Sequence, residues 1–417
     1  MTPEHLQQAT IILQRINELA SISEMPGVIT RTLGTEAFIK GRALVAQWMQ
    51  QAGLQTRIDA IGNIRGKLVS PKADAKTLVI ASHIDTVVNA GKFDGPLGVL
   101  MGLNAVEQLI QKNNTLPFHI ELIAFCDEEG VRFHTTYLGS KVLAGHFDNN
   151  LLAKQDANGT TLQQVIQAMG GNTTLLQQDV IPADDWLGYF EIHIEQGPVL
   201  YERNIPVGIV TAIAGQKRIA LTFTGEAGHA GTVPMHMRSD ALCAASEFIL
   251  EAERFAANPV HRVVATIGTL QITHAASNVI PGEVSCTLDL RSDDQSVLSS
   301  CYKQLEQLAA TICERRNIVL DWESVQESNP VTCDTTMNHL LAHSVQQAGY
   351  EVVNLVSGAG HDAVAIAPVS PVAMLFVRCF KGISHNPLEN VELKDIAAAV
   401  DVSAIFMQTL IQKYNPA

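Results

Sequence analysis

Short, mainly apolar runs that alternate with helical stretches place the strongest limit on how this chain can fold. Residues 78–81 and 120–126 form two such runs, and between them residues 97–110 carry apolar side chains at helical spacing. Runs of this length are typical of strands that are buried on both faces of a sheet. Residues 189–193 and 372–377 have the same character. This order predicts an α/β domain with a mixed, mostly parallel sheet flanked by helices.

Residues 213–325 follow a different, α+β pattern inside this α/β order. The expected elements are strand 219–224, helix 239–256, strands 263–272 and 283–290, and helix 297–315. The α/β pattern resumes beyond them, so the region is an insertion. A chain of 417 residues also exceeds the size at which one hydrophobic core usually divides. We expect one domain of residues 1–212 and 326–417, and an inserted domain of residues 213–325.

The charge balance argues against one large class of partners. The chain has 42 acidic and 28 basic residues, a formal net charge of −14, and such a balance disfavours binding to the phosphate backbone of nucleic acids. Residues 1–5 lack the basic and apolar regions of a secretory signal, and no uninterrupted apolar stretch reaches membrane-spanning length. Seven cysteines without a C-x-x-C pair argue against a cysteine zinc site. We expect a soluble, cytoplasmic protein without nucleic-acid or membrane partners.

Residues that commonly bind metals follow four of the expected strands. They are His83, the acidic run 127–129, His193 and His385, while Asp94 lies in a loop that opens a helix. In open α/β sheets, ligands collect at the carboxyl ends of the strands. One such residue alone is more often structural, but together they supply the nitrogen and oxygen ligands that Zn²⁺ and Mn²⁺ accept. One bridging carboxylate can hold two ions about 3.5 Å apart.

The assembled pattern resembles that of the M20 family of two-metal peptidases and amidohydrolases, over about residues 30–410. The resemblance implies two metal sites that share one carboxylate. The first site would consist of His83, Asp94 and His193, and the second of Asp94, Glu129 and His385. Asp85 would fix the orientation of His83, because ligating imidazoles normally need such a partner.

His193 distinguishes this sequence from the peptidases of the family, which commonly have an acidic residue there. Residues 193–197 instead resemble the ureido-hydrolase branch. That resemblance implies hydrolysis of a ureido C–N bond in a small carboxylate, with allantoate as the expected substrate and ureidoglycine, carbon dioxide and ammonia as products. An N-carbamoyl-L-amino acid hydrolase or β-ureidopropionase is the alternative, and a peptidase is a weaker one. A non-catalytic binding protein is opposed by the presence of every expected ligand.

The resemblance also implies catalytic roles for two residues that are not ligands. Glu128, next to the expected ligand Glu129, would take a proton from water and deliver it to the leaving ammonia. His229, in the glycine-containing segment 228–235, would stabilise the oxyanion, often across a dimer interface. A turn of this kind alone is more often structural.

Substrate contacts follow from the same resemblance. Arg291 ends an expected strand and would bind the substrate carboxylate bidentately, with Asn278 beside it. Further polar contacts would come from Gln196, Lys217, Gly358 and Gly360. Lys217 replaces an arginine of some allantoate hydrolases, and His361 and Asp362, which follow the two glycines, could equally be structural.

The expected cofactors are two divalent metal ions per subunit, Mn²⁺ or Zn²⁺, with Co²⁺ also compatible with histidine and carboxylate ligands. The resemblance further implies that residues 1–212 and 326–417 form the catalytic two-metal domain. Residues 213–325 would then form a ferredoxin-like lid and dimerisation domain, and the protein would be a homodimer.

Overall fold

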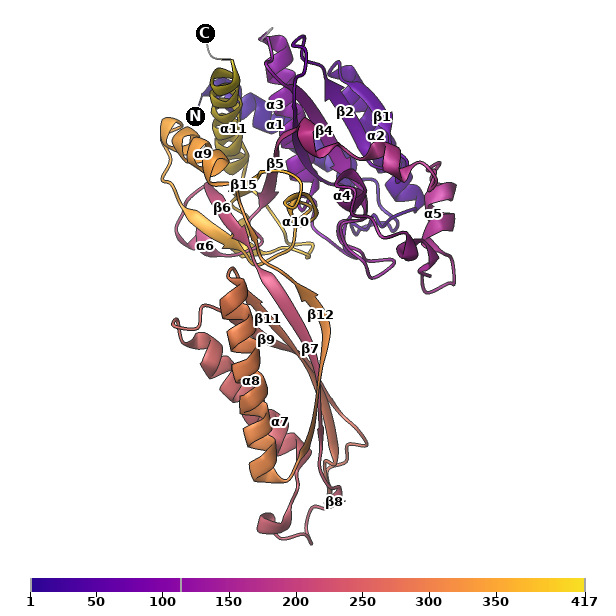
Figure 1. Cartoon of the computed structure of the whole chain (residues 1–417), viewed down its shortest axis with the longest axis vertical. Coiled ribbons are helices and arrows are strands. Elements are labelled where there is room, and N and C mark those ends of the chain that lie inside the picture. The colour runs from indigo at the N-terminus through magenta and orange to yellow at the C-terminus, as the bar shows by residue number, and fades with distance from the viewer. Residues whose placement is uncertain (1, 113–114, 416–417) are drawn as a thin grey trace. The chain divides into compact units, whose positions relative to one another are not determined.

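The chain folds into two compact units in the computed structural model, which describes residues 2–112 and 115–415 (Figure 1). Unit 1 consists of Met1–Thr211 and Cys333–Ala417, and unit 2 consists of Ala212–Thr332. Unit 2 covers the region in which the sequence changes from an α/β to an α+β pattern. Its roles as a lid and a dimerisation domain stay predictions.

A mixed nine-stranded sheet forms the centre of unit 1, although its edge strand β13 and the last two residues of β6 fall within the bounds of unit 2. Its order is β1-β2-β4-β3-β5-β15-β6-β13, and β14 pairs with β6. The strands span Gln55–Ile58 (β1), Ile64–Leu68 (β2), Thr77–His83 (β3), His119–Phe125 (β4), Trp186–Ile194 (β5), Val207–Ile213 (β6), Val331–Thr332 (β13), Asn354–Ser357 (β14) and Val372–Val377 (β15). The central strands β4, β3, β5 and β15 are parallel neighbours, whereas β1, β2, β6 and β13 pair antiparallel. The predicted mixed sheet flanked by helices is confirmed, with parallel pairing in its four central strands.

The helices of unit 1 pack on this sheet and on one another. They span Pro3–Ala20 (α1), Glu36–Gln51 (α2), Pro96–Gln111 (α3), Leu138–Leu143 (α4), Leu162–Ala168 (α5), Val199–Glu202 (α6), Thr335–Gln347 (α9), Ala363–Ile366 (α10) and Leu393–Tyr414 (α11). Short 3-10 turns span Asn149–Ala153, Leu176–Asp179, Ala183–Asp185 and Phe380–Gly382. Helix α3 contacts β3, β4 and β5, while α9 and α11 contact β15. Every residue of β3 and β15 is buried, which explains why these strands read as continuous apolar runs.

Local sequence signals decide where several of these helices begin. The Thr35 side chain accepts a hydrogen bond from the Phe38 amide and caps α2. Helix α3 begins differently, with Gly95 at φ 82° followed by Pro96 at the first helical position. A Cβ atom on residue 95 would lie 2.5 Å from the His83 ring. The Gly95-Pro96 pair therefore starts α3 and also lets the backbone pass close to His83.

Unit 2 is a four-stranded antiparallel sheet with two helices. In chain order its elements are Gly215–Thr224 (β7), Gly228–His229 (β8), a 3-10 turn at Met235–Met237, Ala241–Ala257 (α7), Val264–Ile272 (β9), Val279–Ile280 (β10), Glu283–Ser292 (β11), Gln295–Arg316 (α8) and Val319–Ser328 (β12). The sheet order is β12-β7-β11-β9, and β8 pairs with β10. This βαββαβ order is that of ferredoxin-like folds. Burial alternates strictly along β7 and β11, because one face packs on α7 and α8 and the other stays polar.

Helix α11 is long and apolar enough, by length and composition alone, to cross a membrane. Its most apolar 18-residue window is 67% buried inside the protein, and the helix packs on α1, α3 and α9. Asp395 interrupts the apolar sequence and pairs with Arg378, with 2.7 Å between Nη2 and Oδ1. These contacts are typical of a core helix of a soluble protein.

Candidate metal site

The carboxyl ends of the four parallel strands bring the predicted metal ligands together. His83 is the last residue of β3, the acidic run 127–129 follows β4, and His193 is near the end of β5. His385 follows β15 after a short 3-10 turn. Because the strands are parallel neighbours, these ends lie on the same edge of the sheet. Asp94 joins them from the loop that precedes α3.

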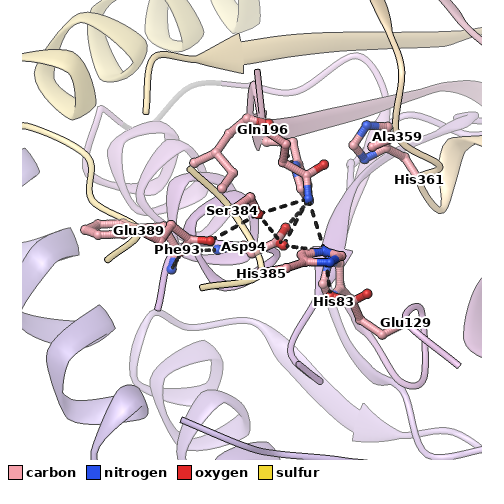
Figure 2. A network of polar contacts seen from close by, with 12 residues as sticks. His83, Phe93, Asp94, Glu129, Gln196, Ala359, His361, Ser384, His385 and Glu389 are labelled. Carbon is pink, nitrogen blue, oxygen red and sulfur yellow. Dashed lines mark hydrogen bonds and ion pairs between the residues drawn. The ribbon is translucent and has the colours of Figure 1, made fainter. Parts of the chain in front are cut away.

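Asp94 lies at the centre of this cluster (Figure 2). Its Oδ1 atom is 3.2 Å from Nε2 of His193, and its Oδ2 atom is 3.1 Å from Nε2 of His385. The latter nitrogen is also 3.5 Å from Oε1 of Glu129. Two groups have ligand atoms within 4.8 Å of one another, namely His83 with Asp94 and His193, and Asp94 with Glu129 and His385. The structure thus assembles the two ligand sets expected from the sequence around one shared carboxylate.

Backbone carbonyl groups orient two of the imidazoles. Nδ1 of His83 lies 3.0 Å from the Asp85 carbonyl oxygen, and Nδ1 of His193 lies 3.0 Å from the Ile194 carbonyl oxygen. A carbonyl oxygen only accepts, so each Nδ1 carries the hydrogen and each Nε2 keeps a free lone pair in the neutral ring. Both imidazoles are therefore prepared to bind a metal ion through Nε2.

Asp85 contacts both His83 and the acidic run that follows β4. Its carboxylate accepts hydrogen bonds from the amides of Glu128 and Glu129, both at 3.1 Å. Its Oδ1 atom is 3.7 Å from Nδ1 of His83, which is beyond a hydrogen bond. Asp85 thus contacts His83 through its main chain, while its side chain holds the acidic run. The sequence pattern H-x-D could not separate these two roles.

Three loops of the site contain non-glycine residues in the left-handed region. They are Asp127 at φ 55°, Gln196 at φ 55° and His385 at φ 54°. Each lies at or beside an expected ligand or substrate contact, and each conformation costs free energy that the surrounding contacts must offset. Such outliers cluster at functional sites.

Burial and mutual repulsion shift the pKa values of the carboxylic acids. Burial, followed by the negative charge of Glu129, raises the pKa of Glu128 well above its usual value. Burial and Asp94 raise the pKa of Glu129 to about 7. Burial opposes ionisation of Asp94 as well, but the hydrogen bond from His385 and the nearby imidazoles outweigh it and lower the Asp94 pKa. The cluster concentrates acidic groups in a place where an isolated negative charge is unfavourable.

The balance between burial and nearby charges differs between the two buried imidazoles. Burial lowers the pKa of His193 to about 4, so this ring is neutral at pH 7. Burial opposes the charging of His83, yet Asp85 and the other carboxylates raise its pKa to about 9. Neutral imidazole and carboxylate are the donors that divalent ions such as Zn²⁺ and Mn²⁺ take. The donor set and its surplus of acidic groups fit a divalent metal ion.

Four residues that the sequence did not assign, or left open, also belong to this region. Glu191 is buried on β5, and together with His193 and His361 it forms a further group with ligand atoms within 4.8 Å. Ser384 and Glu389 contact Asp94 and its loop through hydrogen bonds (Figure 2). The contacts of Ser384 and Glu389 join segments almost 300 residues apart in the chain. No periodicity or motif in the sequence could therefore predict them.

The glycine-rich turn before α10 is shaped by close contacts. A Cβ atom on Gly360 would lie 1.8 Å from the Tyr137 hydroxyl oxygen, whereas a Cβ atom on Gly358 would meet no atom within 4 Å. His361 next to them is buried, with its Nε2 atom 2.8 Å from Oγ of Ser357 and its ring 4.5 Å from that of His193. The turn therefore packs against His193, one of the predicted metal ligands.

Unit 2 holds the other predicted site residues at the two ends of its sheet. His229 is exposed on β8, opposite Val279, and the Ala230 amide donates to the Asn278 carbonyl oxygen. Strand β11 runs from Glu283 to Ser292. His229 and Asn278 lie beyond its Glu283 end, whereas Arg291 is near its Ser292 end. Positions 283 and 291 are separated by about 27 Å along an extended strand. Within one chain, Asn278 and Arg291 therefore lie far apart, and their shared contact with a substrate stays a prediction.

Arg291 and Lys217 also differ in the face of the sheet that they occupy. Arg291 forms a bidentate pair with Asp289, at 2.7 and 3.0 Å, on the face away from the helices. Lys217 points to the helix-covered face, where its Nζ atom is 2.5 Å from Glu327 and 4.9 Å from the centre of the Tyr302 ring. These two predicted substrate contacts are not brought together within unit 2.

Comparisons with known proteins give a consistent result along the chain. The family model described as peptidase family M20/M25/M40 matches residues 79–409. "Allantoate deiminase 1" of Glycine max is 38% identical, covering 95% of this chain and 88% of that protein. "N-carbamoyl-L-amino acid amidohydrolase" of Geobacillus stearothermophilus is 37% identical, covering 95% and 97%. The crystal structure of an amidase of the hydantoinase/carbamoylase family from Burkholderia multivorans has a TM-score of 0.89 at 32% identity, covering 96% and 97%.

Proposed function

Since the chain belongs to peptidase family M20/M25/M40, we propose that it is a metal-dependent amidohydrolase that cleaves a ureido C–N bond in a small carboxylate. The single observation that carries the proposal is the position of Asp94 between His193 and His385, at 3.2 and 3.1 Å. The allantoate deiminase and N-carbamoyl amino acid hydrolase among its relatives support ureido chemistry.

Two divalent ions, Mn²⁺ or Zn²⁺ with Co²⁺ as a further candidate, are the proposed cofactors. His83 and His193 would hold one ion, Glu129 and His385 the other, and Asp94 would contact both. Bound ions would polarise the ureido carbonyl group and activate a water molecule for attack. The Nδ1 contacts of His83 and His193 with backbone carbonyl groups support this assignment, because they leave Nε2 available.

Glu128 is the proposed general base and acid. Its amide is fixed by the Asp85 carboxylate, and burial with the charge of Glu129 keeps its pKa high. A carboxylate with a raised pKa accepts a proton from water readily and can then return it to a poor leaving group. Glu128 would thus take the proton from the attacking water and protonate the leaving ammonia.

Arg291 is the proposed partner of the substrate carboxylate. Its guanidinium group already binds the Asp289 carboxylate in the bidentate manner that a substrate acid would use. Gln196, Gly358 and Gly360 are proposed as further polar contacts. Lys217 is a further proposed substrate contact, although its contacts with Glu327 and Tyr302 favour a structural role.

His229 and Asn278 are proposed to act on the substrate of a second copy of the chain, within a cytoplasmic homodimer. The distance of about 27 Å along β11 supports this, because one small substrate cannot span it. Exposure of both side chains on unit 2 leaves them accessible to another subunit. His229 would stabilise the developing oxyanion.

Allantoate is the proposed substrate, and an N-carbamoyl-L-amino acid is the alternative. Ammonia release from both compounds, measured with the metal-loaded protein, tests the choice. Turnover of allantoate well above that of carbamoyl amino acids is expected. Turnover of carbamoyl amino acids alone would replace the substrate but keep the reaction class. Cleavage of dipeptides without any ureido turnover would contradict the reaction class itself.

A further inference from the structure

The buried carboxylate of Glu389 contacts Asp94 in two ways. It binds the Asp94 main chain directly and reaches the Asp94 side chain through Ser384. Oε1 of Glu389 accepts the amide hydrogens of Phe93 at 2.7 Å and of Asp94 at 3.2 Å. Oε2 of Glu389 is 3.2 Å from Oγ of Ser384, which itself lies 2.9 Å from Oδ2 of Asp94 (Figure 2). Glu389 is only 4% exposed. The four contacts close a ring from Glu389 through Ser384 and Asp94 back to Glu389.

The backbone around this ring is built to accept the Glu389 side chain. A Cβ atom on Gly91 would lie 2.2 Å from the carboxyl carbon of Glu389. Any larger residue at position 91 would displace that group, so the loop before α3 follows the surface of Glu389. Glu389 thereby determines where the loop presents Asp94.

The hydroxyl group of Ser384 connects the two carboxylates. It has one hydrogen and two acidic acceptors, and the shorter distance, 2.9 against 3.2 Å, is to Asp94. Oδ2 of Asp94 also accepts from Nε2 of Gln196 at 3.0 Å. These donors fix Oδ2 on the side of His385, which leaves Oδ1 facing His193.

We propose that Glu389 is a positioning residue that acts through Ser384 and the amides of Phe93 and Asp94 to hold the shared ligand Asp94 for both metal ions. The inference rests on the proposed metal site. Removal of outer partners of this kind commonly weakens metal binding about 10- to 100-fold.

The expected ranking of variants follows from the hydrogen bonds. Glu389→Ala leaves the amides of Phe93 and Asp94 without an acceptor and should weaken metal affinity about 10- to 100-fold. Glu389→Gln keeps an acceptor for these amides and offers Ser384 a donor, so its hydroxyl hydrogen is directed to Asp94. This variant should recover most of the affinity. Ser384→Ala removes only the side-chain link and should fall between the two.

Calorimetric titration of the metal-stripped full chain with Mn²⁺ and with Zn²⁺ tests the proposal, together with the Tm of each metal-free variant. Glu392→Ala is the matched control, because this nearby exposed glutamate pairs with Lys394 at 2.6 Å. Its metal affinity should equal that of the wild type. A positioning role predicts that Glu389→Ala and Ser384→Ala lose affinity by more than their metal-free Tm values explain.

The outcomes separate this inference from the proposed function. A wild-type protein that binds neither ion removes the proposed metal site and the inference together. Wild-type binding with unchanged affinity in Glu389→Ala and Ser384→Ala overturns only the inference. Equal losses of metal affinity in Glu389→Ala and Glu389→Gln would also overturn it, because the oxygen that accepts the amides of Phe93 and Asp94 would then have no effect on metal binding. If Glu389→Ala does not fold, Ser384→Ala decides alone, since it removes one hydroxyl group from a partly exposed position.

Discussion

The polar groups at the strand ends of unit 1 and those on the open face of unit 2 are arranged in opposite ways. In unit 1, buried carboxylates gather around Asp94, and their partners are imidazoles, amides and other acids. In unit 2, Asp289 lies between Arg218 and Arg291. Burial opposes its ionisation, but the two guanidinium groups outweigh it and lower its pKa. Unit 1 therefore has an excess of acidic groups, which favours binding of a cation, whereas the two guanidinium groups around Asp289 in unit 2 leave an excess of one positive charge.

The largest effect should come from the acid that is expected to move protons in unit 1. Glu128→Gln keeps the shape of the side chain but removes its ability to accept a proton. We expect kcat to fall about 10²- to 10⁴-fold, with KM and metal affinity close to those of the wild type. Steady-state kinetics with titrated metal measure this. Unchanged kcat would remove Glu128 from the mechanism.

Unit 2 provides a matched pair of arginines around one carboxylate. Arg291→Gln removes the proposed partner of the substrate acid and should raise KM roughly 10- to 100-fold, the expected loss of a charged hydrogen-bonded contact. Arg218→Gln removes a contact with the same Asp289 and is the control. Its KM should change less than about threefold. Equal effects of the two variants would mean that only the Asp289 network matters.

A buried acid of unit 1 away from the proposed metal ligands should make stability depend on pH. Burial, followed by the charge of Asp179, raises the pKa of Asp59 to about 6 from the ordinary 3.8. Between these values the folded protein keeps a proton that the unfolded chain releases, so stability should fall as pH rises through this window and stay lower above it.

Asp59→Asn removes this titration. The Tm of the variant relative to the wild type should rise by a few degrees from pH 4 to pH 7, measured on metal-free protein. Contacts that asparagine cannot make lower the Tm of the variant at pH 4 and at pH 7 alike. The informative quantity is therefore the change in the Tm difference between these two pH values. A constant difference between the two proteins would contradict the raised pKa.

The smallest kinetic effect should come from Lys217, on the helix-covered face of unit 2. Lys217→Met keeps the aliphatic chain near Tyr302 but loses the ion pair with Glu327. We expect a modest loss of Tm and a KM within about twofold of the wild type. A large rise in KM would instead indicate that Lys217 contacts the substrate.

The sequence predicted the α/β fold and the residues that meet around Asp94, because buried strands and the ligand types that follow them leave a readable pattern. It could not predict which acceptor each side chain uses. The Asp85 carboxylate holds the amides of Glu128 and Glu129 rather than His83. Glu389 reaches Phe93 across 296 positions. Such contacts depend on how distant loops meet in space, and motif spacing does not encode them.

For a related reason, the sequence did not predict that Asn278 and Arg291 lie far apart within one chain. The two residues are 13 positions apart in the sequence, which suggests proximity. An extended strand, however, moves the chain about 3.4 Å per residue, so β11 carries Arg291 away from the β8–β10 pair. Sequence distance therefore misleads where a long strand intervenes.

The central claim is that Asp94 is shared by two metal ions. A crystal structure of the Mn²⁺-loaded protein, with anomalous diffraction measured for manganese, tests it most directly. Our account predicts two anomalous peaks about 3.5–4 Å apart, one beside His83 and His193, the other beside Glu129 and His385, with Asp94 contacting both. A single peak, or ions that do not contact Asp94, would contradict it.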